Sequence, residues 1–329
     1  MDLLPSPEQA EIANSARSFL AAEVPMTAVR ANADRPGVDR DVWARVGALG
    51  WFGLGLDEAS GGVGYGLPEE VLLFREIGRF LAPGPFVASA LAARVAAAAG
   101  ESTTAGAIVE GRAVVGLAEP FGDRYRLLDA THADLVLTVD ADGAALTERS
   151  AWGDVEPAVA MDPTVELAYA RAPDGPPIVV AIGRAVAERG AVLTAAMLVG
   201  TAEATRDMSA QYAKDREQFG KPIGTFQAVK HRCADMAVRC EVTLDLTIYA
   251  ALLFDAGSPD APLHVAAAKA LAGEYAIANA FDNVQNHGGI GVTWEHDAHL
   301  FVKRAHVAAS TFGGRTEQLA SVLAAPAAS

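Results

Sequence analysis

Three long stretches with a helical pattern follow Arg184, and they restrict the fold more than any other feature of the chain. They are "RAVAERGAVLTAAMLVGTAEATRDMSAQYAKD", "TFQAVKHRCADMAVRCEVTLDLTIYAALLFDAG" and "PLHVAAAKALAGEYAIANAFDNVQNHGG". Alanine, glycine and serine recur in them at helical spacing, which permits close antiparallel packing. Two shorter helical stretches, "EHDAHLFVKRAHVAASTFGG" and "RTEQLASVLAA", complete the chain. The sequence therefore predicts a C-terminal four-helix bundle domain over residues 184–329.

The first hundred residues also have a helical pattern. In "SPEQAEIANSARSFLAAEV", Ser6 is a candidate N-cap, Pro7 takes the first helical position, and Glu8 and Glu11 lie near the helix start. Three more helices are expected in "DRDVWARVGALGWFGLGL", "PEEVLLFREIGRFLAPGP" and "FVASALAARVAAAAG", the first of them ending at Gly50 or Gly53. We predict an N-terminal α-helical domain over residues 1–105.

The pattern changes to short β-rich runs from about Ala107. These runs are "AIVEGRAVVGLAEP", "ADLVLTVD", "GAALTER" and "PIVVAIG", and turn residues separate them. About six short strands are expected, which is a reduced β-domain over residues 106–183, either a sheet or a barrel. The chain as a whole is predicted to be mainly α with this small β-domain in the middle.

Composition excludes several classes of protein. With 329 residues, of which 51% are hydrophobic, the chain can build a core and is not expected to be disordered. A net charge of −15 makes nucleic acid an improbable partner, because phosphate binding needs a basic face. The N-terminus has no basic segment before an apolar core, and no long strongly apolar run appears. We expect neither a signal peptide nor a membrane span, and a cytoplasmic location.

The two cysteines, Cys233 and Cys240, are seven residues apart in a predicted helix. They share one face but are separated by about 10 Å of helical rise, too far for a disulfide. We expect two free thiols in a reducing cytosol, and no metal site.

The run "DREQFGKPIGTFQAVKH", Asp215 to His231, interrupts the helical pattern. Gly220 and Gly224 predict a turn between two helices. A helix–turn–helix corner explains the glycines and the proline but does not require Arg216 or Gln218. A guanidinium, an amide and a phenyl ring together can bind a planar heterocycle and a diphosphate. From spacing alone, the corner is the favoured interpretation.

A second run, "DNVQNHGGIGVTWEHD", ends the next long helix near His287. Glycines at 288, 289 and 291 let the backbone pass close to another group, and backbone amides there can face a phosphate. Helix C-caps have the same letters. The run is not G-x-G-x-x-G and does not follow a strand, which disfavours a Rossmann site.

Together the two runs and the α–β–α order resemble the acyl-CoA dehydrogenase family over essentially the whole chain. The resemblance is strongest in "AKDREQFGKPIGTFQAVKHRCADMA" and "QNHGGIGVTWEHD", and weaker in "LGWFGLGLDEASGGVGYG", "FREIGRFLAPGP" and "VVGLAEP". It implies FAD-dependent α,β-dehydrogenation of an acyl-CoA thioester, with a carboxylate base at the α-carbon and an electron-transferring flavoprotein as acceptor.

The resemblance also implies a cofactor site that holds the adenosine diphosphate end of an FAD bound mainly by a neighbouring subunit. Arg216 would pair with the pyrophosphate, Phe219 would pack near the cofactor, and Gln285 would complete the site with backbone amides. The full set of residues that match the family pattern is Arg216, Gln218, Phe219, Phe226, Gln227, Gln285, Gly288, Gly289, Thr316 and Glu317.

The chain departs from the family at the catalytic base. Most members have a glutamate in a Tyr-Glu-Gly-Thr stretch, where this chain reads "TFGGRTEQ". Phe312 takes the tyrosine place, Gly313 the glutamate place, and Arg315 replaces a flavin-contacting threonine. Some members carry the base on the first long C-terminal helix, where Gly190 aligns here. A glycine cannot abstract a proton, so the catalytic residue is unknown from sequence.

Two glutamates are weak candidates for the base. Glu188 is two residues from the aligned position, about 200° around a helix, and fits a helix-start glutamate better. Glu295 lies with His296 and Asp297 in "TWEHD", where acidic residues also cap or begin the next helix. His231 and His287 are expected to be structural or interface residues.

The β-domain departs from the family as well. After "GLAEP" a full-length member has a Trp-Ile-Thr-Asn-like strand that meets the flavin ring, whereas this chain continues with "FGDRYRLLDATHADLVLTVD". Trp152, in "SAWGD", comes too late and lies in a turn-like context. The half-site for the isoalloxazine is therefore expected to be degraded, and a deletion of two strands or so fits the short chain.

These departures predict a base-lacking subunit of a heteromeric acyl-CoA dehydrogenase. Its partner would be a homologous base-bearing subunit in a heterotetramer, and its substrate a bulky or unusual acyl-CoA of lipid or steroid catabolism. One alternative is a self-sufficient homo-oligomer that uses Glu295 or Glu188. Another is a non-redox acyl-CoA-binding or scaffold protein.

Overall fold

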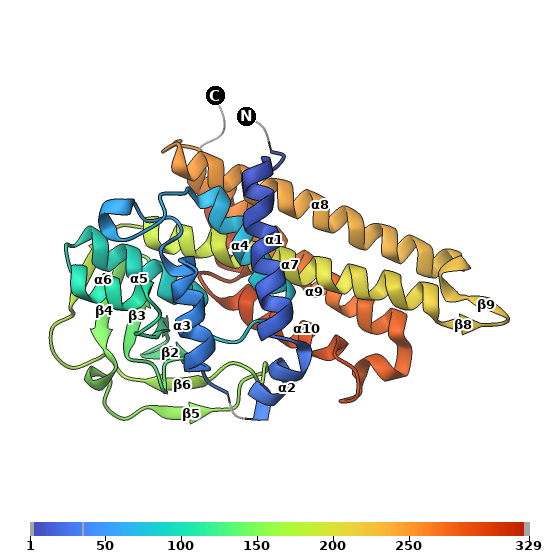
Figure 1. Cartoon of the computed structure of the whole chain (residues 1–329), viewed down its shortest axis with the longest axis horizontal. Coiled ribbons are helices and arrows are strands. Elements are labelled where there is room, and N and C mark those ends of the chain that lie inside the picture. Colours follow the sequence, from blue (N-terminus) through green and yellow to red (C-terminus); the bar gives the residue numbers. More distant parts are fainter. Residues whose placement is uncertain (1–2, 35, 326–329) are drawn as a thin grey trace. The chain divides into compact units, whose positions relative to one another are not determined.

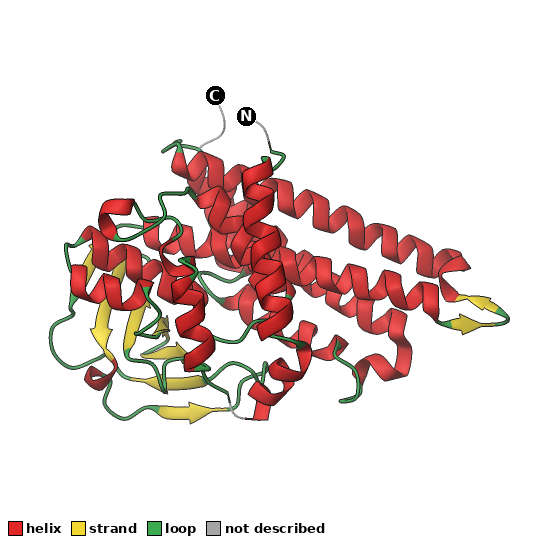
Figure 2. Cartoon of the chain, in the orientation of Figure 1, coloured by secondary structure: helices red, strands yellow, loops and turns green. Residues whose placement is uncertain are grey.

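The computed structural model describes residues 3–34 and 36–325 and divides into two compact units (Figure 1). The first unit consists of the N-terminal segment through Met26, Val71–Ala82, and the chain from Thr194 onward. The second unit consists of Thr27–Glu70 and Pro83–Leu193. Helices dominate, and the strands are concentrated in one part of the chain, which confirms the predicted fold class (Figure 2). The division into three domains at residues 106 and 184 stays a prediction.

The first unit is a helical bundle. Its helices are α1 (Pro7–Glu23), the end of α4 (Leu67–Arg79), most of α7 (Ala185–Asp215), α8 (Gln227–Asp255), α9 (Ala261–His287), α10 (Ala298–Ser310) and α11 (Arg315–Ala324). One buried cluster joins α7, α8, α9 and α10 through small side chains: Ala195, Leu198, Ala202, Cys240, Ala272, Ala276 and Ala305. The predicted four-helix bundle is confirmed, and small residues at its centre let the helices approach closely.

Helix α1 begins where its sequence predicts. The Ser6 hydroxyl accepts a hydrogen bond from the Gln9 backbone N–H at 3.2 Å, and the Gln9 side chain accepts one from the Ser6 N–H at 2.9 Å. This reciprocal pair is a capping box, with Pro7 at the first helical position.

The backbones of α4 and α7 touch within the first unit. A Cβ added to Gly78 would lie 2.0 Å from the Met197 carbonyl oxygen, and one added to Gly200 would lie 1.8 Å from the Arg75 carbonyl oxygen. Only glycine allows this approach. Beside the contact, Arg75 donates two hydrogen bonds to the buried carboxylate of Glu203, at 2.7 and 2.8 Å.

Asparagines on α9 form a buried polar network between α7 and α8. Asn283 accepts a hydrogen bond from Ser209 at 3.0 Å, and Asn279 donates one to the Met236 carbonyl at 3.1 Å. Because a helix shift would leave these amides unpaired, the network fixes the helix register. Cys233 and Cys240 lie in this region and are free, as predicted; burial raises the pKa of Cys240 to about 12.

The second unit contains a seven-stranded sheet with short helices. The helices are α2 (Met26–Asp34), α3 (Arg40–Ala48), α5 (Phe86–Ala98) and α6 (Ser102–Val109). The strands are β1 (Val115–Phe121), β2 (Arg124–Leu128), β3 (Leu135–Val139), β4 (Gly143–Glu148), β5 (Glu156–Ala158), β6 (Leu167–Ala170) and β7 (Val179–Ile182). Their order is β5-β6-β2-β1-β3-β4-β7, with β1 and β3 parallel and all other neighbours antiparallel.

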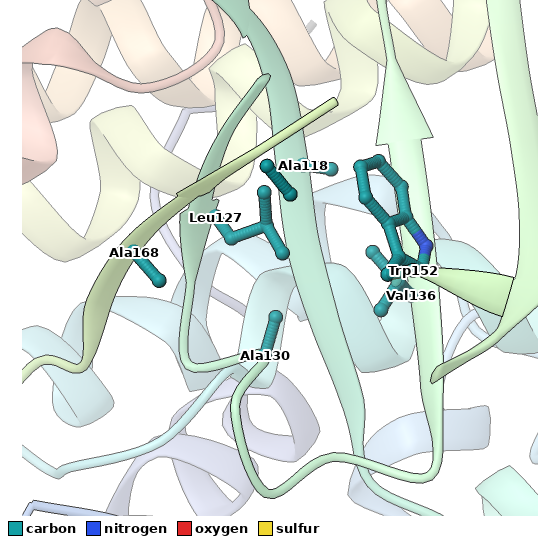
Figure 3. Packing of buried hydrophobic residues seen from close by; sticks show 7 residues of the cluster. Ala118, Leu127, Ala130, Val136, Trp152 and Ala168 are labelled. Carbon is teal, nitrogen blue, oxygen red and sulfur yellow. The ribbon is translucent and has the colours of Figure 1, made fainter. Parts of the chain in front are cut away.

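Trp152 fills the core on one face of this sheet (Figure 3). Its ring is 1% exposed and meets the Tyr125 ring edge-on with centroids 5.4 Å apart. Its Nε1–H donates to the Thr147 hydroxyl at 2.9 Å. Trp152 is thus a structural residue of the β-rich part, in agreement with its turn-like sequence context.

Several local predictions are corrected. Residues 107–109, expected to begin a strand, end helix α6, and the sheet has seven strands rather than about six. Helices α2 and α6 and strands β2, β5 and β6 were not expected. These segments are short, and a few apolar residues do not distinguish a strand from a buried helix by periodicity. The expected helix end near Gly50 is confirmed, since α3 ends at Ala48 and Gly50 has a φ of 76°.

Among residues 3–34 and 36–325, one helix, α7, has the length and apolar composition of a membrane span. Of its most apolar window, 72% is buried inside the protein. Such burial is typical of the core helix of a globular domain.

Replacing Gly200 by alanine tests the α4–α7 contact. We expect Gly200→Ala to lower the free energy of unfolding by about 1–3 kcal/mol or more, because the two backbones must separate. Gly106→Ala is the matched control: Gly106 lies inside α6, where an added Cβ meets nothing within 4 Å, so the change should be neutral or stabilising. Urea denaturation of both variants measures the difference; equal stability would contradict the contact.

Candidate functional site

The first sequence run forms a β-hairpin that joins the C-terminal end of α7 to the N-terminal end of α8 (Figure 1). Its strands are β8 (Glu217–Gln218) and β9 (Lys221–Pro222), followed by a short 3-10 turn, Ile223–Thr225. Phe219 and Gly220 at the tip have φ values of 54° and 76°. Two positive φ angles define a type I′ turn, which places a non-glycine residue in a strained region. The predicted helix corner is therefore a projecting hairpin.

An aromatic pair, exposed Phe219 and half-buried Phe226, marks this hairpin. Phe219 is 90% exposed and meets Phe226 edge-on, with ring centroids 6.0 Å apart. The Lys221 Nζ lies 4.6 Å from the Phe226 ring centroid, a cation–π distance. A phenyl ring held in a strained turn and facing solvent is the kind of group that binds a flat ligand or a second chain.

Polar side chains around the hairpin are directed to solvent. Arg216 and Gln227 are exposed, and neither side chain forms a hydrogen bond or ion pair with the residues that the structure describes. The Gln218 amide donates to the Glu217 carbonyl at 2.8 Å. The guanidinium of Arg216, with five donors, is available for an anionic ligand.

The second run forms an open glycine turn at the end of α9. Gly288 has a φ of 66° and its N–H caps the helix at the Gln285 carbonyl. An added Cβ at Gly288 or Gly289 would meet nothing within 4 Å, whereas one at Gly291 would lie 2.8 Å from the Val284 oxygen. Gly291 is therefore required by the chain itself, and Gly288 and Gly289 leave the backbone accessible. Gln285 is exposed beside them.

Three aromatic rings connect the end of α7, just before the first run, with the second run. The His287 ring stacks on Tyr212 with centroids 4.2 Å apart, and it contacts the His296 ring at 4.3 Å. The Nδ1 of His287 donates to the Asn283 carbonyl at 2.8 Å, since a carbonyl can only accept. Burial lowers the pKa of His287, and the neighbouring His296 lowers it further. The ring is 6% exposed, which agrees with the structural role expected for His287.

The turn at the expected base position is filled by the chain itself. Phe312 and Gly313 have φ values of 51° and 89°. The Gln318 amide donates to the Phe312 carbonyl at 2.7 Å, and a Cβ added to Gly313 would lie 2.4 Å from that amide nitrogen. From α9, the buried ammonium of Lys269 donates to the Ala309 carbonyl at 3.0 Å. No carboxylate occupies this turn at position 313.

The residues after this turn serve helix α11. The Glu317 carboxylate accepts a hydrogen bond from the Gly314 N–H at 2.8 Å, which caps the helix start. Arg315 donates to Glu274 of α9 at 3.1 Å, and Thr316 is exposed. Their predicted contact with a flavin stays a prediction.

The two glutamates considered as bases lie in different units. Glu188 is in the first turn of α7 in the second unit, with its carboxylate 3.9 Å from Arg184 and a side chain 19% exposed. Glu295 is exposed in the first unit. Helix α10 is preceded by Asp297, whose side chain makes no capping hydrogen bond; the His296 Nδ1 accepts from the Ala298 N–H instead, at 3.1 Å. Within the described ranges, no group of three or more acidic, histidine or cysteine side chains could hold a metal.

Acid sensitivity tests the buried state of His287. The folded pKa is lowered from the ordinary 6.5, so the unfolded chain binds the proton first as pH falls. Stability should therefore decrease as pH falls through about 6.5 and level off below the lowered folded pKa. His287→Phe should flatten this part of the profile, while an exposed control, His231→Gln, should not. Thermal melting between pH 5 and 8 checks both; parallel profiles would contradict the assignment.

A methyl group at position 313 tests the filled turn. Gly313→Ala should cost about 1–2 kcal/mol, because an L-residue is strained at this φ and displaces the Gln318 amide. Gly314→Ala is the matched control, since Gly314 has a φ of −73° and its nearest neighbour would lie 4.0 Å away. The melting temperatures of the two variants measure their difference in stability. A stable Gly313→Ala variant with an unstable Gly314→Ala control would contradict the filled turn.

Comparison with known proteins assigns the chain to a family. A profile described as "Acyl-CoA dehydrogenase, C-terminal domain" matches residues 180–327, and "Acyl-CoA dehydrogenase, N-terminal domain" matches residues 6–105. Acyl-CoA dehydrogenase IpdE2 of Mycobacterium tuberculosis is 33% identical over 321 residues, 96% of each chain. Acyl-CoA dehydrogenase FadE34 of the same organism is 38% identical over 87% of this chain and 42% of its own length.

Solved structures agree with this placement. A variant of the Tcur3481–Tcur3483 steroid ACAD is 26% identical, with a TM-score of 0.84 and 96% of each chain covered. Butyryl-CoA dehydrogenase from Megasphaera elsdenii shares the fold, with 20% identity, a TM-score of 0.84 and 98% of each chain covered. The chain belongs to the acyl-CoA dehydrogenase family, whose members are oxidoreductases acting on the CH–CH bond of acyl-CoA.

Proposed function

We propose that this chain is the base-lacking subunit of a heteromeric, FAD-dependent acyl-CoA dehydrogenase. The observation that carries the proposal is Gly313 in a turn filled by Gln318, at the position where most members have the catalytic glutamate. In this proposal a carboxylate of a homologous partner subunit removes the α-proton of the substrate. FAD, when bound, accepts the β-hydrogen as a hydride.

The exposed groups of the first unit fit one end of this cofactor. A diphosphate needs a guanidinium and a backbone that it can approach closely, which exposed Arg216 and the open turn at Gly288 and Gly289 offer. An adenine needs flat apolar contact, which exposed Phe219 offers. The proposed set of FAD-binding residues also includes Gln218, Phe226, Gln227, Gln285, Thr316 and Glu317. The isoalloxazine would be held mainly by the partner.

The partner and substrate are proposed from the comparisons together with the missing base. The related Tcur3481–Tcur3483 steroid ACAD is named for two components, which supports a two-component enzyme. We propose a heterotetramer acting on a bulky, steroid-type acyl-CoA, with an electron-transferring flavoprotein as acceptor. A cytoplasmic location is part of the same proposal.

Flavin stoichiometry tests the proposed subunit role. Co-expression of this chain with a homologous, glutamate-bearing chain should give a complex with one FAD per pair, and the chain alone should bind none. Absorbance at the flavin band against protein concentration measures the ratio. Full FAD occupancy and dye reduction by the lone chain would overturn the proposal in favour of a homo-oligomer. The variants Glu295→Gln and Glu188→Gln would then identify the base of that homo-oligomer. A colourless, inactive complex would instead indicate a scaffold.

Removal of one guanidinium tests the proposed diphosphate contact. Arg216→Ala in the complex should weaken FAD binding about 10- to 100-fold, because a charge-assisted hydrogen bond to phosphate is lost. Lys214→Ala removes the same charge from an exposed position two residues away and is the matched control. Fluorescence titration of the apo-complex with FAD gives both dissociation constants; equal effects of the two variants would leave only general electrostatics and contradict the contact.

A further inference from the structure

We infer that the aromatic column Tyr212–His287–His296 is a positioning element, which holds the β8–β9 hairpin and the glycine turn at the spacing that FAD requires. The inference rests on the proposed function, because it concerns the same cofactor half-site. None of the three residues is among those expected to touch the cofactor.

Two rings of the column, Tyr212 and His287, lie next to proposed FAD contacts, and the third, His296, lies at the start of α10. Tyr212 lies one helical turn before Arg216, whose N–H donates to the Tyr212 carbonyl at 2.8 Å. His287 is the last residue of α9 and directly precedes Gly288. His296 precedes α10 and accepts from its first N–H. Contact between the rings therefore links the end of α7, the end of α9 and the start of α10.

His287 is the central member of the column because it contacts both other rings. Its plane is inclined by 29° to Tyr212 and by 46° to His296. The hydrogen bond from Nδ1 to the Asn283 carbonyl fixes its ring orientation from the preceding helical turn. A ring held by one hydrogen bond, one stacked ring and one tilted ring has little freedom, so the size of this ring sets the distance between its two neighbours.

The column is separate from the interactions that hold the bundle together. The small-residue cluster of α7 to α10 contains none of the three rings. The register of the helices is fixed by Asn279 and Asn283, through bonds to Ser209 and Met236. Loss of the His287 ring would thus leave the bundle assembled while the ends of α7 and α9 lose their common spacer. Groups that bind one ligand from two segments depend on such a spacer.

The test compares two replacements of His287 in the complex with the base-bearing partner. His287→Phe keeps a flat ring and loses the Nδ1 hydrogen bond; His287→Ala removes the ring. We expect His287→Ala to weaken FAD binding about tenfold and His287→Phe to restore most of that loss, because stacking rather than the hydrogen bond sets the spacing. Titration of the apo-complexes with FAD gives the dissociation constants, and circular dichroism of the same samples verifies the fold.

A second variant keeps the test decisive where His287→Ala does not fold. His296→Ala removes the half-buried end of the column and should weaken FAD binding in the same direction. Unchanged FAD affinity in a folded His287→Ala or His296→Ala complex would overturn the inference, as would equal losses in His287→Ala and His287→Phe. If Arg216→Ala also leaves the affinity unchanged, the proposed half-site itself is wrong; if Arg216→Ala weakens FAD and the ring variants do not, only the inference fails.

Discussion

The backbone contact between α4 and α7 is the constraint on which the first unit depends. Gly78 and Gly200 bring the two helices closer than any side chain would allow, and beside this contact half-buried Arg75 pairs with the buried carboxylate of Glu203. A buried ion pair alone adds little stability, because desolvation offsets its attraction, but it disfavours any other register. Helix α7 then runs on through Tyr212 to Asp215, so the place of the projecting hairpin follows from where α7 crosses α4.

Two regions of the bundle that family members use for catalysis differ in this chain: one is exposed and the other is filled by side chains. Around Arg216 and Gly288, polar groups and an aromatic ring stay exposed, although a monomer gains nothing from a solvent-facing phenyl in a strained turn. Around Gly313, the space and the carbonyls are taken by Gln318 and Lys269. One region is open to solvent and the other is closed, and this asymmetry supports the proposal of a subunit that completes a site on another chain.

The accuracy of sequence prediction in this protein depends on how far apart in the sequence the interacting residues lie, and local interactions are predicted best. The start of α1 is specified by Ser6, Pro7 and Gln9 within one turn, and was predicted. The type I′ hairpin was not, because its signal is Phe219 at a positive φ, and Asn or Gly usually marks such turns. The sequence predicts a strand from Ala107, inside helix α6, because an eight-residue apolar segment has too few turns to show its period.

Local patterning by itself determined the long helices, the N-cap of α1, the missing glutamate at position 313 and the membership of the family, because each depends on residue identity over a few turns or on a contiguous motif. Only the tertiary structure decided that Gln318 fills the space beside Gly313 and that His287 joins Tyr212 to His296. Tyr212 and His287 are separated by 75 positions in the sequence, and no helical or strand period encodes a stacking contact over that separation. Such a contact arises only when packing fixes the register of α7 against α9.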